Sequence, residues 1–340
     1  MVQNKRFIYA SEFKGNIKPE NFKLLHEELP ALKNGEILCR ATYLSVDPYM
    51  RAYGSMISTG ETMVGSQIAV VVESKHKDYP VSTNVFAYFG WRLYTICNPE
   101  CVNTGLNITG KLEAIPDFEG LPLSYALGAL GMTGNTAYFG FLEICNPQPI
   151  ETVVVSAAAG AVGSHVGQIA KIKGCKVIGI AGSEEKIKYL KEELKFDEAI
   201  NYKTQDIRKE LSKIAPLGID CYFDNVGGEI SSDVISLMRL NGRISACGSI
   251  SVYNDDFMKY GLSKAPVIQP FIVKNQLKME GFLVFRYMDR FHEGAKQNLQ
   301  WIKQKKLKYR EFVIQGFEKM PDALISIMKG ENIGKTIVKV

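Results

Sequence analysis

Long hydrophobic runs, blocks of one charge and low-complexity segments are all missing from these 340 residues. No apolar stretch approaches the roughly 20 residues that a membrane-spanning helix needs, so we expect no membrane insertion. The opening residues MVQNKRFIYA lack the hydrophobic segment of a secretory signal peptide, which predicts a cytoplasmic protein. Lys and Arg number 41 against 36 Asp and Glu, and the net charge of +5 is spread along the chain. We therefore expect no nucleic-acid partner, because such partners favour clustered basic residues.

Clusters of metal ligands and of covalent catalytic residues are equally scarce. The chain has four histidines, which stand far apart in the sequence, and seven scattered cysteines. Cys97 and Cys101 are closely spaced, but no second cysteine pair completes a tetrahedral zinc site. No G-x-S-x-G motif marks a serine nucleophile. We expect neither a metal ion nor covalent catalysis, and the odd number of cysteines predicts reduced thiols.

The stretch 152–167, TVVVSAAAGAVGSHVG, has the pattern of a buried strand that leads through a glycine turn into a helix. Residues 153–155 are all valine, as in a parallel strand covered on both faces. In the dinucleotide fingerprint G-x-G-x-x-G, Ala158 takes the first position, Gly160 the second and Gly163 the third. Gly160 would let the backbone approach a pyrophosphate, and Gly163 would let the helix pack closely on the strand. The pattern predicts nucleotide binding; a glycine turn in another kind of α/β protein is the alternative.

Strand patterns alternate with helix patterns from this point onward, which predicts a doubly wound parallel sheet in an α/β fold. Six strands are expected, at 152–158, 175–182, 198–203, 218–227, 242–252 and 277–285. Helical patterns separate most of them, and a long helical pattern follows the last strand.

The first third of the chain has a different texture. Residues 1–121 contain short strand patterns broken by Gly, Pro and Asn, which predicts a β-barrel-like domain with a loop at 46–56. The chain ends in the strand pattern TIVKV, which we expect to return to this domain. We therefore expect one domain from 1–121 and 306–340, and a nucleotide-binding domain at 122–305.

The end of the second expected strand bears on the choice of cofactor. NAD-specific folds usually carry an acidic residue there, which binds both ribose hydroxyls. Here the strand ends at Gly182 and Ser183, with Lys186 nearby, which suits the 2′-phosphate of NADPH better. Glu184 and Glu185 occupy the first turn of the next helix, where a favourable interaction with the helix dipole explains them. For Lys186, a solvated helix lysine is the alternative.

Five motifs distributed along the chain carry a family resemblance: LSVDPYMR, VSAAAGAVGSHVGQIAKIKGCKVIGIAGSEEK, GIDCYFDNVGGE, ACGSISVYN and GENIGKT. They resemble the zinc-free medium-chain dehydrogenase/reductases of the prostaglandin reductase 1 family, also called leukotriene B4 12-hydroxydehydrogenases. Where related zinc enzymes carry a Cys and a His-Glu pair, this chain has Ser45, Ser66 and Gln67. It departs from the family at Thr133 and Asn135, where relatives often carry Pro and Leu.

The resemblance implies a GroES-like barrel, a Rossmann domain and NADPH-dependent reduction of the C=C bond of α,β-unsaturated aldehydes and ketones. It implies oxo-eicosanoids such as 15-oxo-prostaglandins as substrates, and leukotriene B4 12-hydroxy oxidation as a further activity. The resemblance also implies the residues that bind the cofactor. Those at the pyrophosphate are Ala159, Gly160, Ala161, Val162 and Gly163, and those at the 2′-phosphate are Lys186 and Tyr202, to which the strand end adds Ser183. Along the path to the nicotinamide lie Asn225, Cys247, Gly248, Ser249, Ile250, Ser251 and Tyr253, with Phe282, Leu283 and Val284 in the nicotinamide pocket and Asn332 across the cleft.

Reduction of an electron-poor alkene by hydride needs little acid–base chemistry. Negative charge develops on the carbonyl oxygen, and one preorganised hydrogen-bond donor is sufficient to stabilise it. Tyr253 follows the fifth expected strand, near the carboxyl edge of the sheet where ligands bind, and is the catalytic candidate, with a packing role as its alternative. Tyr49 and Arg51 are candidates for binding the substrate tail, although an ion pair with Asp47 explains Arg51 equally well.

Two other functions fit the same features. A quinone oxidoreductase would share the fold and the cofactor, and a non-catalytic NADPH sensor would bind the cofactor without turnover. The segment 267–287 is long and apolar for the edge of a sheet, and uncovered edges pair with other chains. We therefore expect a two-fold homodimer that joins two Rossmann sheets, as the resemblance also implies.

Overall fold

The computed structural model describes residues 2–103, 109–255 and 267–340. The chain divides into two compact units. Unit 1 comprises Met1–Leu127, Phe312–Asn332 and Thr336–Val340, and unit 2 comprises Gly128–Glu311 and Ile333–Lys335. These boundaries fall a few residues from those expected at 121 and 305.

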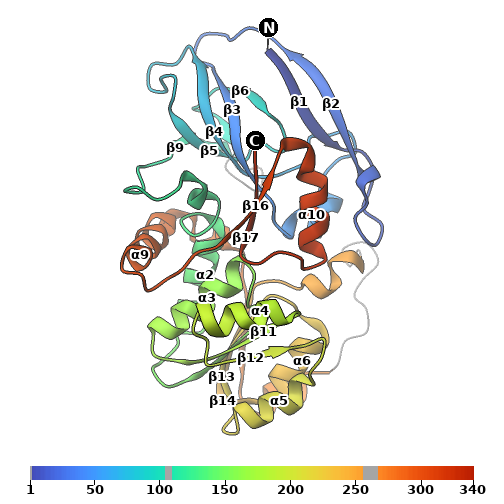
Figure 1. The fold of residues 1–340 in the computed structure, drawn as a ribbon, viewed down its shortest axis with the longest axis vertical. Helices are drawn as coiled ribbons and strands as arrows, with labels where there is room; N and C mark the ends of the chain where they lie inside the picture. Colours follow the sequence, from blue (N-terminus) through green and yellow to red (C-terminus); the bar gives the residue numbers. More distant parts are fainter. Residues whose placement is uncertain (1, 104–108, 256–266) are drawn as a thin grey trace. The chain divides into compact units, whose positions relative to one another are not determined.

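Unit 1 is built on strands that are mostly antiparallel (Figure 1). Its main sheet has the order β16-β17-β3-β4-β5-β9, with β6 also paired to β3, while β1–β2 and β7–β8 form separate two-stranded sheets. The strands are β1 Val2–Tyr9, β2 Phe22–Leu29, β3 Ile37–Ser45, β4 Gln67–Ser74, β5 Asn84–Ala87, β6 Tyr94–Cys97, β7 Val102–Asn103, β8 Thr109–Gly110, β9 Glu113–Ala114, β16 Glu311–Gln315 and β17 Lys335–Lys339.

The end of the chain completes this sheet. β17 runs antiparallel to β3, with Ile337 opposite Ser45 and Lys339 opposite Tyr43. Ile337 and Val338 are fully buried, which accounts for the apolar strand pattern of the last residues. Helix α10, Met320–Met328, precedes the strand and buries Met320 and other apolar side chains in the same core.

The expectation of a loop at 46–56 is wrong. This segment contains the single helical turn α1, Tyr49–Ala52, and a 3-10 turn at Gly54–Met56. Pro48 stands at the N-cap of α1 with φ −61° and ψ −24°. Proline is compatible with the start of a helix because its fixed φ is helical and its missing N–H would have no intrahelical partner there.

Unit 2 contains a six-stranded sheet within the described residues, and its order is β12-β11-β10-β13-β14-β15. Every neighbouring pair is parallel. Numbered along the unit, this is the order 3-2-1-4-5-6 of a doubly wound dinucleotide-binding fold. The strands are β10 Thr152–Val155, β11 Lys176–Ala181, β12 Glu198–Asn201, β13 Ile219–Asp224, β14 Met238–Ala246 and β15 Lys278–Gly281. The predicted α/β fold class, with a separate β-rich domain, is confirmed.

Helices cover both faces of this sheet, which explains its uninterrupted apolar strands. Val153 and Val155 pack with α2, α3 and α9 on one face, whereas Val154 and Ile178 pack with α5, α6 and α8 on the other. The helices are α2 Met132–Leu142, α3 Ala161–Ile172, α4 Glu184–Lys188, α5 Ile207–Ile214, α6 Gly228–Ser236, α8 Gln269–Lys274 and α9 Phe291–Lys303, with a π-helical turn at Tyr189–Glu193 and 3-10 segments at Ile250–Asp255 and Val284–Arg290.

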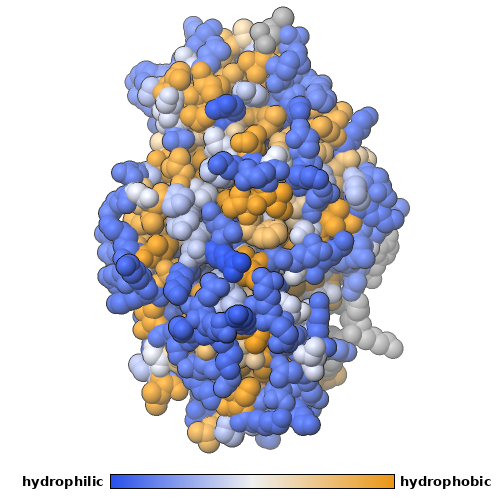
Figure 2. All heavy atoms as spheres, in the orientation of Figure 1, coloured by the Kyte–Doolittle hydropathy of each residue, from blue (hydrophilic) through white to orange (hydrophobic). Residues whose placement is uncertain are grey.

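Hydrophilic residues cover most of the face shown in Figure 2, and hydrophobic residues gather in patches between them. Among the described residues, no helix combines the length and the hydrophobicity that crossing a membrane requires.

Candidate cofactor site and active site

The glycine turn between β10 and α3 has the shape that the fingerprint predicts. The strand ends at Val155, and the chain turns at Ala157, whose φ of 48° is left-handed. A Cβ on Gly163 would lie 2.4 Å from the carbonyl oxygen of Ala157 and 2.8 Å from the Cα of Ala158. Only glycine permits this approach, so the close packing predicted for Gly163 is confirmed.

The N-terminus of α3 can hold a pyrophosphate. Gly160 is the N-cap residue, and the N–H of Ser164 makes the first helical hydrogen bond to its carbonyl oxygen, at 3.0 Å. The N–H groups of Ala161, Val162 and Gly163 precede that bond, so helix geometry leaves them without intrahelical acceptors. These groups and the positive end of the helix dipole suit an anion. The cradle therefore fits the phosphates of a dinucleotide.

Gly334 of the GENIGKT motif contacts this turn, and both belong to unit 2. The Gly334 N–H donates to the carbonyl oxygen of Ala159 at 2.8 Å, and Gly334 forms a parallel bridge with Gly160. This contact supports the turn from outside the strand–helix connection. Asn332 belongs to unit 1, and its role in cofactor binding stays a prediction.

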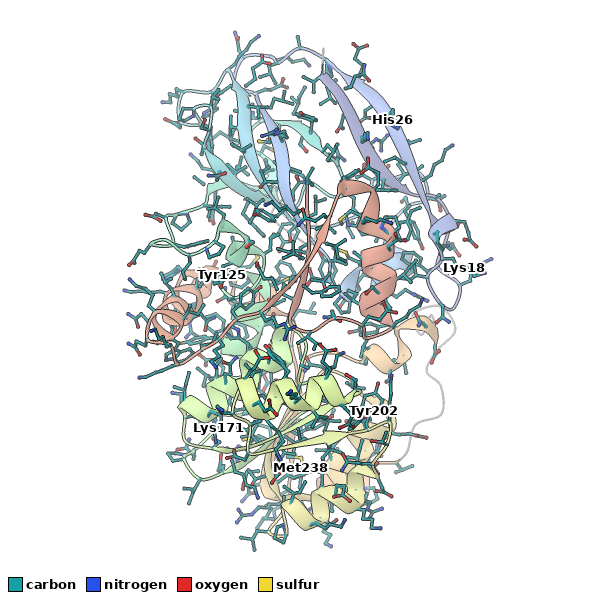
Figure 3. All side chains as sticks on the ribbon, in the orientation of Figure 1. Lys18, His26, Tyr125, Lys171, Tyr202 and Met238 are labelled. Atoms are coloured by element: carbon teal, nitrogen blue, oxygen red, sulfur yellow. The ribbon has the colours of Figure 1, made fainter. Side chains whose placement is uncertain are left out.

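The ends of β11 and β12 bring together the residues predicted at the 2′-phosphate. Ser183 is the N-cap of α4, and its Oγ accepts the Lys186 N–H at 3.3 Å. Tyr202 follows β12 directly, as Figure 3 shows, and is 44 % exposed. Its N–H donates to the carbonyl oxygen of Ala181 at 3.1 Å, which fixes the start of the turn.

A second lysine stands at the same place. Burial lowers the pKa of the Lys186 ammonium, and the nearby charge of Lys203 lowers it further. The two ammonium groups therefore raise the local positive potential, which suits a phosphate. Sequence reasoning missed Lys203, although its position directly after Tyr202 and the third strand of the sheet was a usable signal.

A buried carboxylate organises the loop after β13. Asp224 ends the strand and is 3 % exposed. Its Oδ1 accepts hydrogen bonds from Ser156 Oγ at 3.1 Å, from Tyr222 Oη at 2.8 Å, and from the N–H groups of Val226 and Gly227, both at 2.9 Å. Four donors offset much of the cost of taking this carboxylate out of water.

The same network holds two predicted cofactor loops. Asn225 donates its N–H to Ser156 Oγ at 2.9 Å and its side-chain amide to the Ser156 carbonyl at 2.8 Å. The carbonyl oxygen of Asp224 accepts the N–H groups of Cys247 and Gly248, at 2.8 and 3.1 Å. Asp224 and Ser156 thus tie the end of β10 to both loops. Sequence reasoning missed both residues; the signal was an acid that closes a buried apolar strand.

The run from Cys247 to Tyr253 folds back on the β13 loop. Ile250 donates its N–H to the Asn225 carbonyl at 3.3 Å, and Ser251 Oγ donates to the Val226 carbonyl at 2.6 Å. Burial, with the charge of Asp224, raises the pKa of the Cys247 thiol to about 12, so the thiol stays protonated at neutral pH.

Tyr253 is the last residue of this run and lies in the 3-10 segment Ile250–Asp255. Its hydroxyl oxygen accepts the Ser249 N–H at 3.3 Å, close to Gly248. The phenol therefore lies beside the loop at the carboxyl edge of the sheet. Its catalytic role stays a prediction.

The predicted nicotinamide pocket divides into buried and exposed side chains. Phe282 and Val284 are 9 % and 7 % exposed, whereas Leu283 is 50 % exposed. The Phe282 ring packs edge-on against Phe223, and a Cβ on Gly140 would come within 2.0 Å of it. The Phe282 side chain therefore belongs to the core, which leaves Leu283 as the exposed side chain of this run.

The predicted substrate residues lie in unit 1. Arg51 is 2 % exposed; its Nη2 donates to the Gly15 carbonyl at 3.0 Å, and its guanidinium lies over the Phe13 ring. Burial raises the pKa of Tyr49 well above its usual range, and the nearby Asp47 and Tyr88 raise it further. Asp47 therefore lies near both Tyr49 and Tyr88. The substrate roles of Tyr49 and Arg51 stay predictions, and sequence reasoning missed Tyr88.

Residues at the positions of the related zinc ligands make ordinary hydrogen bonds. Ser45 Oγ donates to Asp47 Oδ2, and Gln67 Nε2 donates to the Gly90 carbonyl at 2.8 Å. In the part of the chain that the structure describes, no group of three or more His, Cys, Asp or Glu side chains is placed to hold a metal ion. Metal-free chemistry stays an expectation.

Known proteins resemble this chain in sequence and in structure. Family models match at residues 5–104, described as the N-terminal domain of oxidoreductase, and at residues 161–304, described as zinc-binding dehydrogenase. Prostaglandin reductase 1 of Rattus norvegicus is 48 % identical over the whole of both chains. The NADP(+)-dependent 2-alkenal reductase of Nicotiana tabacum is 39 % identical over 100 % of this chain and 98 % of its own. The crystal structure of CurA from Vibrio vulnificus in complex with NADPH is 40 % identical over 99 % of each chain, with a TM-score of 0.89. The chain therefore belongs to the prostaglandin reductase 1 family of medium-chain dehydrogenase/reductases.

Proposed function

We propose that this protein uses NADPH to reduce the C=C bond of α,β-unsaturated aldehydes and ketones, including oxo-eicosanoids such as 15-oxo-prostaglandins. The observation that carries the proposal is the set of groups at one edge of the unit 2 sheet. The fingerprint turn, the basic surface of Lys186 and Lys203, and the two loops tied by Asp224 all occupy that edge. Two relatives, a prostaglandin reductase and a 2-alkenal reductase, support the same reaction class.

Bound NADPH would supply the hydride for the β-carbon of the substrate. The first N–H groups of α3 would bind its pyrophosphate, and Lys186 and Tyr202 would bind its 2′-phosphate. The Tyr253 hydroxyl would donate a hydrogen bond to the carbonyl oxygen of the substrate, where negative charge accumulates. Tyr49 and Arg51 would bind the tail of the substrate.

The proposal is tested by measuring oxidation of NADPH with a panel of enals, enones, 15-oxo-prostaglandins and simple quinones. We expect kcat/KM for the enals and enones to exceed that for quinones, and NADPH to be preferred over NADH. Oxidation of leukotriene B4 in the presence of NADP+ tests the further activity implied by the resemblance. Faster turnover of quinones would identify a quinone oxidoreductase, and binding of NADPH without turnover of any acceptor would identify a sensor.

We also propose that two copies associate through β15. Within the residues that the structure describes, β15 is the last strand of the unit 2 sheet, and Met279 on it is 43 % exposed. Val273 on α8 is 76 % exposed, and Leu283 just after the strand is 50 % exposed. An uncovered strand edge beside exposed apolar side chains favours pairing with a second copy.

Light scattering at micromolar concentration tests this association. The mass of one chain is 37.9 kDa, so we expect a particle of twice that mass. Met279→Lys places a charge on the strand edge and is expected to shift the particle toward the single-chain mass. Leu217→Lys is the control, because Leu217 is 81 % exposed and lies in the turn before β13. A single-chain mass for the unsubstituted protein would contradict the proposal.

A further inference from the structure

Glu184 is the first acidic residue after β11, and a buried amide holds its carboxylate. Its Oε1 accepts a hydrogen bond from Asn201 Nδ2 at 2.5 Å. Asn201 is the last residue of β12, is 3 % exposed, and pairs with Ala181 across the sheet. The donor therefore belongs to a rigid strand end, whereas the Glu184 side chain starts from an exposed helical turn.

The orientation of the Asn201 amide follows from its partners. Its Oδ1 accepts the Lys203 N–H at 3.2 Å, so this atom must be the oxygen. The other atom faces a carboxylate oxygen, which requires a donor. The main chain of Asn201 is fixed as well, because its N–H donates to Gln205 Oε1 at 2.8 Å and its carbonyl accepts the Gln205 N–H at 2.9 Å. One side chain thus connects the first turn of α4 with the turn that carries Tyr202 and Lys203.

This connection controls where a negative charge can lie. An acidic side chain near the end of the second strand binds the ribose hydroxyls in NAD-specific folds and repels a 2′-phosphate. Here the candidate acid is hydrogen-bonded to the end of β12. The two cations proposed near the phosphate are Lys186 on α4 and Lys203, which directly follows Tyr202. Burial lowers the pKa of Lys186, and the charge of Lys203 lowers it further, as expected for two cations near one another.

We propose that Asn201 determines cofactor specificity by holding the Glu184 carboxylate against β12, away from the 2′-phosphate of NADPH and from the ribose hydroxyls of NADH. The inference rests on the proposed use of NADPH. Asn201 is a positioning residue, since it acts on the cofactor through Glu184.

The test compares dissociation constants for NADPH and NADH, measured by titrating nicotinamide fluorescence. In Asn201→Ala the carboxylate is released, and we expect the preference for NADPH over NADH to fall about tenfold, the scale of one partly screened like-charge interaction. Asn201→Ser is a second variant, in which the side chain stays polar but its hydroxyl is too short to reach Glu184. It is expected to lose the same preference. The unfolding midpoint of each variant, compared with that of the unsubstituted protein, tests whether the fold is retained.

Glu184→Gln separates the charge from the turn. As a single variant it keeps an acceptor for Asn201. We expect the NADPH preference to stay within about twofold of the original, because the charge that is removed already lies away from the cofactor. In the double variant Asn201→Ala with Glu184→Gln, no carboxylate is released, and we expect the preference to be restored.

Two results would overturn the inference. If the double variant stays as poorly selective as Asn201→Ala, the loss comes from the turn at 202–204 and Glu184 has no part in it. If Asn201→Ala and Asn201→Ser keep the original preference, the hydrogen bond to Glu184 does not affect specificity. Failure of the proposed function has a different signature, because the unsubstituted protein would then bind NADPH no better than NADH.

Discussion

Gly182 lies directly against Tyr202: a Cβ at residue 182 would come within 2.7 Å of Tyr202 Cε1 and 2.9 Å of its hydroxyl oxygen. The ring of the predicted 2′-phosphate ligand therefore lies where a side chain at residue 182, directly after β11, would otherwise stand. Gly182→Ala should displace this ring and weaken NADPH binding by up to about 1.5–3 kcal/mol, the contribution of one hydrogen bond to a charged group.

NADH lacks the phosphate, so its affinity should change much less in Gly182→Ala. Titration with both cofactors measures the effect. Gly281→Ala is the matched control, because among the described residues a Cβ there would meet the Ala246 carbonyl oxygen alone, at 3.9 Å. Equal losses for the two cofactors would show that Tyr202 supports the strand end without contacting the phosphate.

Lys186→Ala removes a cation from the same site. A charge-assisted hydrogen bond to a phosphate contributes about 1.5–3 kcal/mol, so NADPH affinity should fall by that amount while NADH affinity barely changes. Lys188→Ala is the control on the same helix. Lys188 is exposed, and its Nζ lies 3.8 Å from Glu192 Oε2 in an i,i+4 ion pair. If NADPH and NADH lose equally in Lys186→Ala, the lysine supports the fold instead.

Tyr253→Phe keeps the ring and removes the hydroxyl. In the proposed reaction, charge appears on the carbonyl oxygen as hydride arrives, so the hydroxyl stabilises the transition state more than the ground state. We expect kcat for an enone to fall about tenfold to a thousandfold, with a much smaller change in NADPH affinity. Steady-state kinetics separate the alternatives. A raised KM with unchanged kcat would make Tyr253 a wall of the binding site, and no change in either would remove it from the active site.

Ser156→Ala breaks the link between Asp224 and Asn225. The substitution removes the hydrogen bond from Ser156 Oγ to the buried Asp224 carboxylate and the one from the Asn225 N–H to Ser156 Oγ. We expect the unfolding free energy to fall by about 1–3 kcal/mol. NADPH affinity should fall as well, because both predicted cofactor loops depend on this network. Ser212→Ala is the control: this exposed serine donates to the Arg208 carbonyl at 2.8 Å on the surface of α5. Chemical denaturation and NADPH titration give both quantities. An unchanged NADPH affinity would mean that the loops hold their shape without Ser156.

His165 should make the protein less stable in mild acid. Burial in α3 lowers the pKa of its imidazole from 6.5 to about 4, against an opposing hydrogen bond with Asn298. The unfolded chain therefore binds the proton more tightly than the folded one. The contribution to stability is complete above pH 6.5 and is lost as the pH falls toward 4, by about 3 kcal/mol in all.

His165→Gln removes this titration, so its stability should vary less than that of the original protein between these pH values. His26→Gln is the control, since His26 is exposed on β2 (Figure 3). Urea unfolding at several pH values measures the difference. Parallel pH profiles for His165→Gln and the unsubstituted protein would contradict the prediction.

The sequence alone determined the local elements and the fold class. Valine runs such as 153–155 identify strands covered on both faces, and helical patterns between them require a doubly wound sheet. The fingerprint turn could also be predicted from the sequence, because its chemistry depends on residues close together in the chain. Gly163 could be assigned its packing role from spacing, and the structure confirms it.

The tertiary structure alone decided which distant side chains meet. Asn201 reaches Glu184 across 17 positions, and Ser156 reaches Asp224 across 68. Neither pairing follows from the periodicity of the sequence, which indicates only which face of a helix or strand is buried. The register of neighbouring strands decides which polar groups come within hydrogen-bonding distance. The position of Lys203 after the third strand could be read from the sequence, but its interaction with Lys186 could not, since the repulsion of two charges depends on their separation in space and on burial.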